Sequence, residues 1–202
     1  MDERKGVQHV YLVGAKSLGA YGGYETFVYK LTEYHQNIAN IKYHVACKAN
    51  GDGCMDESKF DGVTKINDHE FELHNAHCFK IDVPQIGPAQ AIYYDVAALK
   101  TCCEHIKKNH IPHPIVYIMA CRIGPFAGHF YREIHKLGGT VYLNPDGECE
   151  IIRGCHNRDK GTAENERLSN PKFIFSYPKN ERLIFLGGRN AAQEEILTMR
   201  VG

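Results

Sequence analysis

The stretch VQHVYLVG, residues 7–14, is rich in β-branched and aromatic residues and ends in a glycine. A continuous apolar run of this kind is typical of a buried parallel strand that leads into a loop. Large apolar residues then recur at helical spacing, at Tyr24, Phe27, Val28, Leu31 and Tyr34. This spacing predicts an amphipathic helix over residues 23–36 with those side chains on its core face. A strand, a glycine loop and a helix in this order form the opening of a βαβ unit.

Strands and helices continue to alternate along the chain. Short strands are predicted at residues 43–47 and 78–83, and the polar segment 48–76 between them has room for a minor hairpin. A helix is predicted at residues 88–109, where apolar side chains again follow a helical period. Its inner stripe is predicted to consist of Ile92, Val96, Leu99, Cys103 and Ile106.

The next segments complete the pattern. Strands are predicted at residues 115–121 and 140–143, on either side of a helix at residues 124–137. This helix is expected to turn four side chains inward, namely Phe126, Phe130, Ile134 and Leu137. The alternation predicts an α/β fold: a Rossmann-like, mainly parallel sheet with helices on both faces.

Three loops follow predicted strands and are dense in Gly, Pro or polar residues: 14–23, 121–125 and 144–147. Ligands of parallel sheets bind at the carboxyl ends of the strands. The loops are therefore predicted to line a shared cleft. The alternative is structural, because tight turns between strands and helices need Gly and Pro in any case.

Composition excludes some classes of protein. The 24 Lys and Arg balance the 24 Asp and Glu, so no overall field favours nucleic acid or anionic lipid. The charged amino terminus lacks the pattern of a signal peptide, and no apolar run is long enough to span a membrane. The eight cysteines are scattered, mostly in apolar runs. We therefore expect reduced thiols and a cytoplasmic protein, with peripheral membrane contact at most.

The first loop partly matches phosphate-binding motifs. Gly14 and Gly19 have the spacing of a phosphate loop, but Ala20-Tyr21 stand where that loop needs Lys and Ser or Thr. The dinucleotide motif GxGxxG is not satisfied either. At the predicted helix start, Gly22-Gly23 leave bare amides that an anion or a sugar hydroxyl can approach. Glu25 in the first turn is expected either to cap the helix or to hold a hydroxyl.

Metal and nucleophile motifs are weak. His69, His74, His77 and Cys78 are grouped as one polar loop cluster, but no Cys-x-x-Cys pair or His-Glu-x-x-His helix occurs. We expect solvated loop histidines and no metal. No Gly-x-Ser-x-Gly elbow is present. At the end of a predicted strand, Arg122 is expected to present its guanidinium to a phosphate or carboxylate, although a helix-flanking ion pair is the alternative.

Three segments together carry a resemblance to a known family. They are VGAK at 13–16 with YGGYETFV at 21–28, VPQIGPAQAIYYD at 83–95, and IMACRIGP at 118–125 with YLNPDG at 142–147. These segments resemble the amino-terminal domain of bacterial rhamnosyltransferases, which are GT-B, family 4-like glycosyltransferases. The resemblance covers about residues 7–147. It implies an acceptor-side domain over residues 1–147.

The resemblance also implies an activity. Such enzymes transfer a sugar, often rhamnose, with retention from a nucleotide-diphosphate sugar to a lipid-linked saccharide at the cytoplasmic membrane face, without cofactor or metal. The products are capsular and other cell-surface polysaccharides. In this reading Asp146 contacts the transferred sugar as the catalytic residue. The substrate-binding residues are Lys16, Tyr21, Gly22, Gly23, Glu25, Arg122 and Asn144.

The chain departs from the family pattern after residue 147. No Trp occurs, and residues 148–202 form an atypical tail with expected strands at 173–177 and 183–186 and a short helix at 191–199. Two expectations follow: a truncated or frame-shifted product, or a protein that works with a separate donor-binding chain. Two other functions stay open: a catalytically inactive saccharide- or partner-binding module, and an unrelated Rossmann-like nucleotide binder.

Overall fold

One sheet organises the fold of the computed structural model, which describes residues 6–19, 22–120, 123 and 126–143 and the backbone of residues 182–185 and 197–200. Its strand order is β3-β4-β5-β2-β1-β6-β7-β8-β9. The strands are β1 (Gln8–Val13), β2 (Ile41–Lys48), β3 (Thr64–Lys65), β4 (Glu70–Leu73), β5 (Ala76–Ile81), β6 (Ile115–Ile118), β7 (Thr140–Leu143), β8 (Arg182–Phe185) and β9 (Leu197–Arg200).

The central strands β5, β2, β1, β6 and β7 are all parallel. Taken in chain order, their sequence across the sheet is 3-2-1-4-5, which is the order of a doubly wound, Rossmann-like fold. The strands β3 and β4 add an antiparallel edge, and β9 is antiparallel to β8 at the other edge. The α/β, Rossmann-like fold predicted from the sequence is therefore confirmed.

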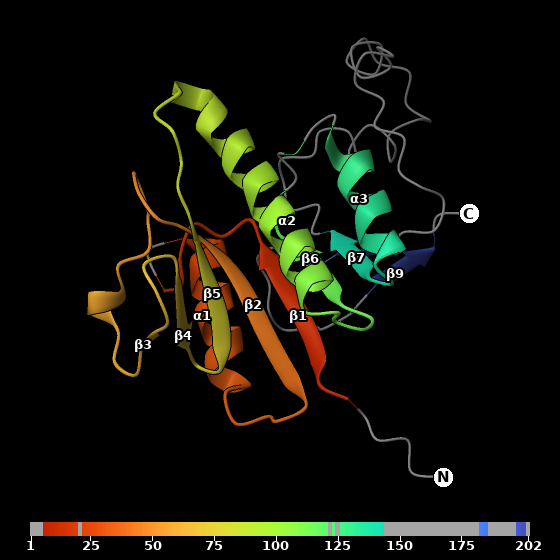
Figure 1. Ribbon diagram of the computed structural model, residues 1–202, viewed down its shortest axis with the longest axis horizontal. Coiled ribbons are helices and arrows are strands. Elements are labelled where there is room, and N and C mark those ends of the chain that lie inside the picture. Colours follow the sequence, from red (N-terminus) through yellow and green to blue (C-terminus); the bar gives the residue numbers. More distant parts are fainter. Residues whose placement is uncertain are drawn as a thin grey trace.

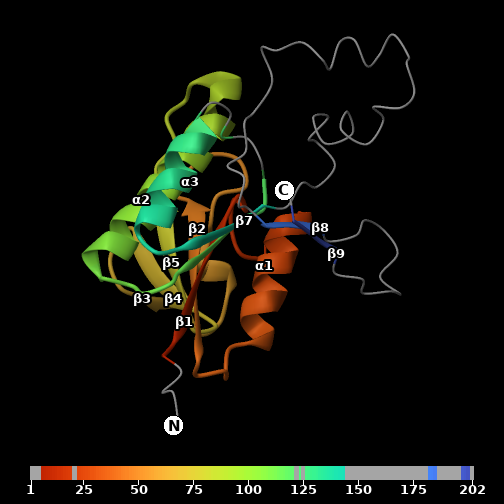
Figure 2. The same ribbon diagram turned by 90° about the vertical axis from the view of Figure 1, so that its right-hand side faces the viewer.

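Helices cover both faces of the sheet, as Figures 1 and 2 show. The helix α1 (Gly23–Tyr34) lies on one face, and α2 (Gln90–Lys108) and α3 (Ala127–Lys136) lie on the other. Two short 3-10 helices, η1 (Glu57–Lys59) and η2 (Gly87–Ala89), belong to the connections. None of these described helices is long and apolar enough to cross a membrane.

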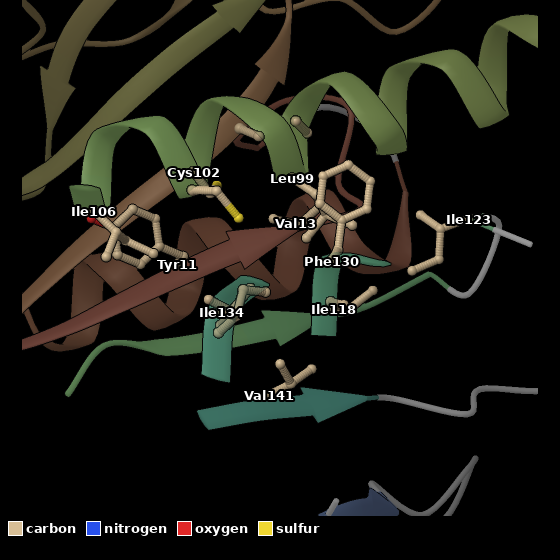
Figure 3. Close-up of a cluster of buried hydrophobic side chains, with 14 of the residues drawn as sticks. Tyr11, Val13, Leu99, Cys102, Ile106, Ile118, Ile123, Phe130, Ile134 and Val141 are labelled. Atoms are coloured by element: carbon tan, nitrogen blue, oxygen red, sulfur yellow. The ribbon is translucent and has the colours of Figure 1, made fainter. Parts of the chain in front are cut away.

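Each face of the sheet has its own hydrophobic core. Figure 3 shows the core under α2 and α3, where Tyr11 and Val13 of β1 meet Leu99, Cys102, Phe130 and Ile134 of the helices. On the other face Val28 of α1 packs with strand residues that include Leu12 and Val45. Burial of each large apolar side chain contributes about 1.5–3 kcal/mol, so these two cores hold the helices on the sheet.

The inner faces of the helices differ from the prediction. Ile92 and Phe126 are 44% and 48% exposed, because both stand at the first turns of their helices, and Tyr34 at the end of α1 is 80% exposed. Phe27 is also partly exposed. The helix α2 is rotated so that its buried face follows Tyr94, Asp95, Ala98, Leu99, Cys102, Cys103 and Ile106. The sequence analysis considered only large apolar residues, so it did not include Asp95 and Ala98 in the buried face of α2.

The polar segment 48–76 contains the predicted hairpin, formed by β3 and β4. A second hairpin joins β4 to β5 through His74 and Asn75, whose φ angles of 51° and 62° are typical of a tight type I′ turn. The strand predicted at 78–83 is confirmed as β5, which begins two residues earlier than expected. His77 and Cys78, grouped above with a polar loop, therefore lie in a strand that pairs with β2 over its whole length.

The carboxyl-terminal region agrees with the sequence analysis in one place and contradicts it in another. The strand β8 confirms most of the strand predicted at 183–186. Residues 197–199, predicted to end a helix, belong instead to β9, whose backbone pairs with β8. The predicted strand 173–177 and the boundary between residues 147 and 148 lie outside the described residues.

The cysteines within the described residues are free thiols, and Cys47, Cys78, Cys102 and Cys103 are buried. Burial raises the pKa of Cys102 and Cys103, the latter to about 11. These thiols therefore pack as small hydrophobic side chains and are poor nucleophiles.

Candidate functional site

The strand order reverses between β1 and β6, and parallel sheets bind ligands beside such a switch point. At this place Gly14 follows β1 with a φ of 114° and lies against the backbone that follows β6. A Cβ at Gly14 would stand 2.7 Å from the backbone nitrogen of Ala120. Only glycine allows this approach, which brings the loops after β1 and β6 into contact. We call the edge formed by these strand ends the carboxyl edge.

The loop between β1 and α1 is clasped by the first turn of its own helix. Glu25 is buried, and its Oε1 accepts a hydrogen bond of 3.0 Å from the backbone N–H of Lys16. Its Oε2 lies over Gly22, where any Cβ would collide with it. The carboxylate therefore holds the loop, a role that the sequence analysis did not foresee, and its expected capping of α1 or contact with a hydroxyl stays a prediction.

Lys16 is fixed through its backbone and exposed through its side chain. Its carbonyl oxygen accepts a 2.7 Å hydrogen bond from the N–H of Lys48. Its Nζ lies 3.4 Å from Oδ2 of Asp52, with side-chain exposures of 41% for Lys16 and 97% for Asp52. Such an exposed pair contributes little stability, so the ammonium can exchange this partner for an anionic ligand.

Tyr94 of α2 ties the strands together beneath the carboxyl edge. Its hydroxyl lies 2.5 Å from the carbonyl oxygen of Ala15 and 2.8 Å from that of Ala46. Burial raises the pKa of Tyr94 well above its usual range, so the hydroxyl stays protonated and donates. The start of the β1–α1 loop is thereby anchored to β2 and α2.

The loop after β2 is anchored in a similar way to the segment after β5. The side chain of Asn50 accepts a 2.8 Å hydrogen bond from the N–H of Val83 and donates a 3.1 Å hydrogen bond to its carbonyl oxygen. The Nζ of Lys48, a largely buried side chain, donates to the carbonyl oxygen of Asp52 at 2.8 Å. These bonds make the described part of the edge a rigid platform on which an exposed cation stands.

The structure brings four of the predicted site residues together. Lys16, Gly22, Gly23 and Glu25 all belong to the β1–α1 connection at the carboxyl edge. Among the described residues, apart from its chain neighbours, no heavy atom lies within 4 Å of a Cβ added on Gly23.

The other four predicted residues, Tyr21, Arg122, Asn144 and Asp146, lie outside the described residues. The strands that lead toward the last three are described. In them Ile118 of β6 and Leu143 of β7 pair side by side, so β6 and β7 end at the same edge.

Sequence reasoning missed Asn50, Lys48 and Tyr94. In the sequence Tyr94 looks like an ordinary core aromatic residue. Asn50 lies in a polar, glycine-containing stretch, and its hydrogen bonds to distant backbone produce no local sequence pattern. Only their long-range partners reveal their role.

Imidazoles gather at a second place, away from the carboxyl edge. His44 of β2, His77 of β5 and His105 of α2 each offer a ring nitrogen, and these atoms lie within 4.8 Å of one another. Burial, with the neighbouring imidazoles, lowers the pKa of His44 to about 2 and that of His105 to about 4. The sequence analysis grouped His77 with two other histidines of its segment, because histidines far apart in the chain share no spacing.

Comparison with known proteins places the chain in a family without settling its activity. No curated protein matches the sequence. A family model matches residues 7–159 of the 202, a span that includes the described strands β1 to β7 and the β1–α1 connection. The chain therefore belongs to the family described as Domain of unknown function (DUF1972).

Proposed function

We propose that the chain is the acceptor-side half of a glycosyltransferase. In this proposal it helps to transfer a hexosyl or rhamnosyl unit from a nucleotide-diphosphate sugar to a lipid-linked saccharide in cell-surface polysaccharide synthesis. The observation that carries the proposal is the β1–α1 loop, which is held rigidly beside the switch point and presents the Lys16 ammonium there. One of the segments that resemble rhamnosyltransferases, residues 13–16 with 21–28, spans this loop.

The chemistry of such a transfer needs two kinds of group. The sugar passes through an oxocarbenium-like transition state, and the leaving diphosphate develops negative charge. Lys16 and Arg122 are proposed to neutralise the diphosphate, and Asp146 to contact the transferred sugar. The amides of Gly22 and Gly23, with Tyr21 and Asn144, are proposed to receive hydroxyls of the saccharide. The fixed backbone of the loop lowers the reorganisation needed at the moment of transfer.

A second candidate is a saccharide- or partner-binding module without turnover. The observation that favours it is the state of Glu25, whose carboxylate is 9% exposed and hydrogen-bonded to a loop amide. A carboxylate that holds the scaffold in this way is poorly placed to exchange protons with a substrate. The two candidates therefore differ in turnover, and both require a saccharide at the carboxyl edge.

The test combines a transfer assay with a binding titration. Purified chain is incubated with a radiolabelled donor, either a nucleotide-diphosphate hexose or nucleotide-diphosphate rhamnose, and with a short-chain polyprenyl-diphosphate saccharide as acceptor. Saccharide binding is followed separately by calorimetry. Lys16→Ala is expected to lower transfer or binding about 10-fold or more, because a charged hydrogen bond contributes about 1.5–3 kcal/mol. Lys65→Ala is the matched control, since Lys65 is an exposed lysine of β3 that pairs with Asp68.

The outcomes separate the candidates. Transfer that falls in Lys16→Ala and Asp146→Ala but not in Lys65→Ala supports the transferase. Saccharide binding with the same dependence on Lys16 but without transfer supports the binding module. If the wild-type chain shows neither, or if the lysine variants behave alike, both candidates are rejected.

A further inference from the structure

The sheet and α2 bring the three imidazoles together from distant parts of the chain. In the parallel register Tyr11 of β1 pairs with His44 of β2, and His44 pairs with His77 of β5. Paired residues of a sheet point to the same face, and this is the face that α2 covers. His105 near the carboxyl end of α2 completes the group, with ring centroids 4.8 Å from His44 and 5.2 Å from His77.

Neighbouring side chains hold the rings and occupy specific nitrogens. Nε2 of His44 lies 2.8 Å from Nδ1 of His9, and Nδ1 of His105 lies 2.8 Å from the hydroxyl of Tyr11. These bonds leave Nδ1 of His44 and Nε2 of His105 for other partners. Metal-binding histidines are commonly oriented in this way, through a hydrogen bond on the nitrogen that does not bind the metal.

Nδ1 of His44 is an unsatisfied buried atom. His44 is 3% exposed, and within the described residues its Nδ1 has no hydrogen-bond partner. A buried polar atom without a partner costs about 1–3 kcal/mol, so it points to a missing ligand. The ring itself is fixed, because it stacks on Tyr11 with the ring centroids 4.4 Å apart.

The charges around the group can tolerate a cation. Oε1 of Glu70 lies 4.0 Å from Nε2 of His77, and Glu72 lies on the same antiparallel strand opposite His77. Lys42 and Lys108 are opposing positive charges, and the Nζ of Lys42 is paired with Glu72 at 2.7 Å. The imidazoles themselves are held neutral by burial, which keeps their lone pairs available.

We propose that His44, His77 and His105 form a binding site for a divalent transition-metal ion, with Zn²⁺ as the ion that suits three converging imidazoles. Zinc bound at about 2.0–2.1 Å holds its nitrogens roughly 3.4 Å apart, so the separations between the ring nitrogens shorten by up to about 1.4 Å. A fourth position stays open for water. The ion would join β2, β5 and α2 between the sheet and the helix.

The test uses untagged full-length chain, stripped with EDTA and desalted. Titration with Zn²⁺ in a calorimeter is expected to show one equivalent bound, and Co²⁺ is expected to give the visible absorption of a tetrahedral site. His77→Gln and His105→Gln are expected to weaken Zn²⁺ binding at least 10-fold. His69→Gln is the matched control, because His69 is an exposed histidine beside the same sheet edge whose near partner is Asp82.

Ring-nitrogen NMR of the wild-type chain keeps the test independent of whether the variants fold. Zn²⁺ is expected to shift the ring nitrogens of His44, His77 and His105 and to leave those of His69 in place. Absence of Zn²⁺ binding by the wild-type chain overturns the proposal, as do equal affinities for all the variants or shifts confined to other histidines. The result does not depend on the proposed transferase, because no readout involves a saccharide.

Discussion

The carboxyl edge and the histidine cluster are built on the same strands but satisfy their polar groups differently. At the edge most of the described groups bind one another: the Glu25 carboxylate accepts a hydrogen bond from a loop amide, and Asn50 binds both backbone groups of Val83, although the buried Oγ of Ser17 has no partner among the described residues. In the cluster the imidazoles bind only in part, and Nδ1 of His44 is left over. The first region is a largely hydrogen-bonded scaffold whose exposed lysine can meet a ligand, whereas the second is proposed to have its ligand position between the sheet and α2.

The largest expected effect concerns the scaffold at the switch point. Gly14→Ala is expected to lower the free energy of unfolding by about 2–5 kcal/mol, from a strained positive φ together with a clash against Ala120. Chemical denaturation checks this value. Gly62→Ala is the control, because Gly62 has a φ of 79° but no atom within 4 Å of its added Cβ.

The two glycine variants separate backbone strain from steric contact. Gly62→Ala is expected to cost about 1 kcal/mol, from strain alone. Equal losses of stability in the two variants would mean that the loops after β1 and β6 do not meet at Gly14. The carboxyl edge would then be no more tightly packed than the surroundings of Gly62.

The next effect belongs to the histidine cluster and appears on acidification of metal-free protein. The folded-state pKa of His44 is about 2, below the usual 6.5, because burial and then His105, His9, His77 and Lys42 disfavour its charge. Below pH 6.5 the His44 imidazole therefore binds a proton in the unfolded chain but stays neutral in the folded chain. As the pH is lowered, the free energy of unfolding falls by about 1.4 kcal/mol per pH unit, or about 2 kcal/mol between pH 6.5 and 5.

Denaturation at several pH values measures this slope. His44→Phe keeps an aromatic ring against Tyr11 and removes the titrating group, so its stability is expected to change less over the same range. A parallel pH dependence in the variant and the wild-type chain would assign the effect to other groups.

The smallest expected effect tests the anchor beneath the edge. Tyr94→Phe removes the hydroxyl that serves Ala15 and Ala46 and is expected to destabilise the fold by about 1–2 kcal/mol. Tyr93→Phe is the matched control, because Tyr93 is 44% exposed and its change should lie within about 0.5 kcal/mol. Thermal melts compare the pair, and equal melting temperatures would show that this hydroxyl does not anchor the loop.

Much of the architecture could be predicted because it follows from local patterns. The run 7–14 gave β1, the helical spacing after it gave α1, and the strand-helix alternation gave a parallel sheet. The same patterns misplaced some inner faces. Phe126 and Ile92 have the spacing of core residues, yet both are exposed at the starts of their helices. Hydrophobic period reports which side of a helix is apolar, and not how far the sheet beneath it extends.

The candidate site was predictable only in its position. Strand ends followed by glycine mark the carboxyl edge in any parallel sheet, so Lys16, Gly22, Gly23 and Glu25 could be selected from the sequence. The role of Glu25 could not be predicted, because its hydrogen-bond partner is a backbone amide nine residues earlier in the chain. A local rule favours capping, and the actual hydrogen bond depends on how the loop folds back.

The sequence by itself determined the alternation of strands and helices, the neutral overall charge and the edge at which the loops gather. The tertiary structure alone decided that His44, His77 and His105 meet, and that Tyr94 and Asn50 anchor loops from other strands. The physical reason is range. Periodicity and turn preference act over a few residues, whereas strand register and helix docking bring together side chains from segments that share no local pattern.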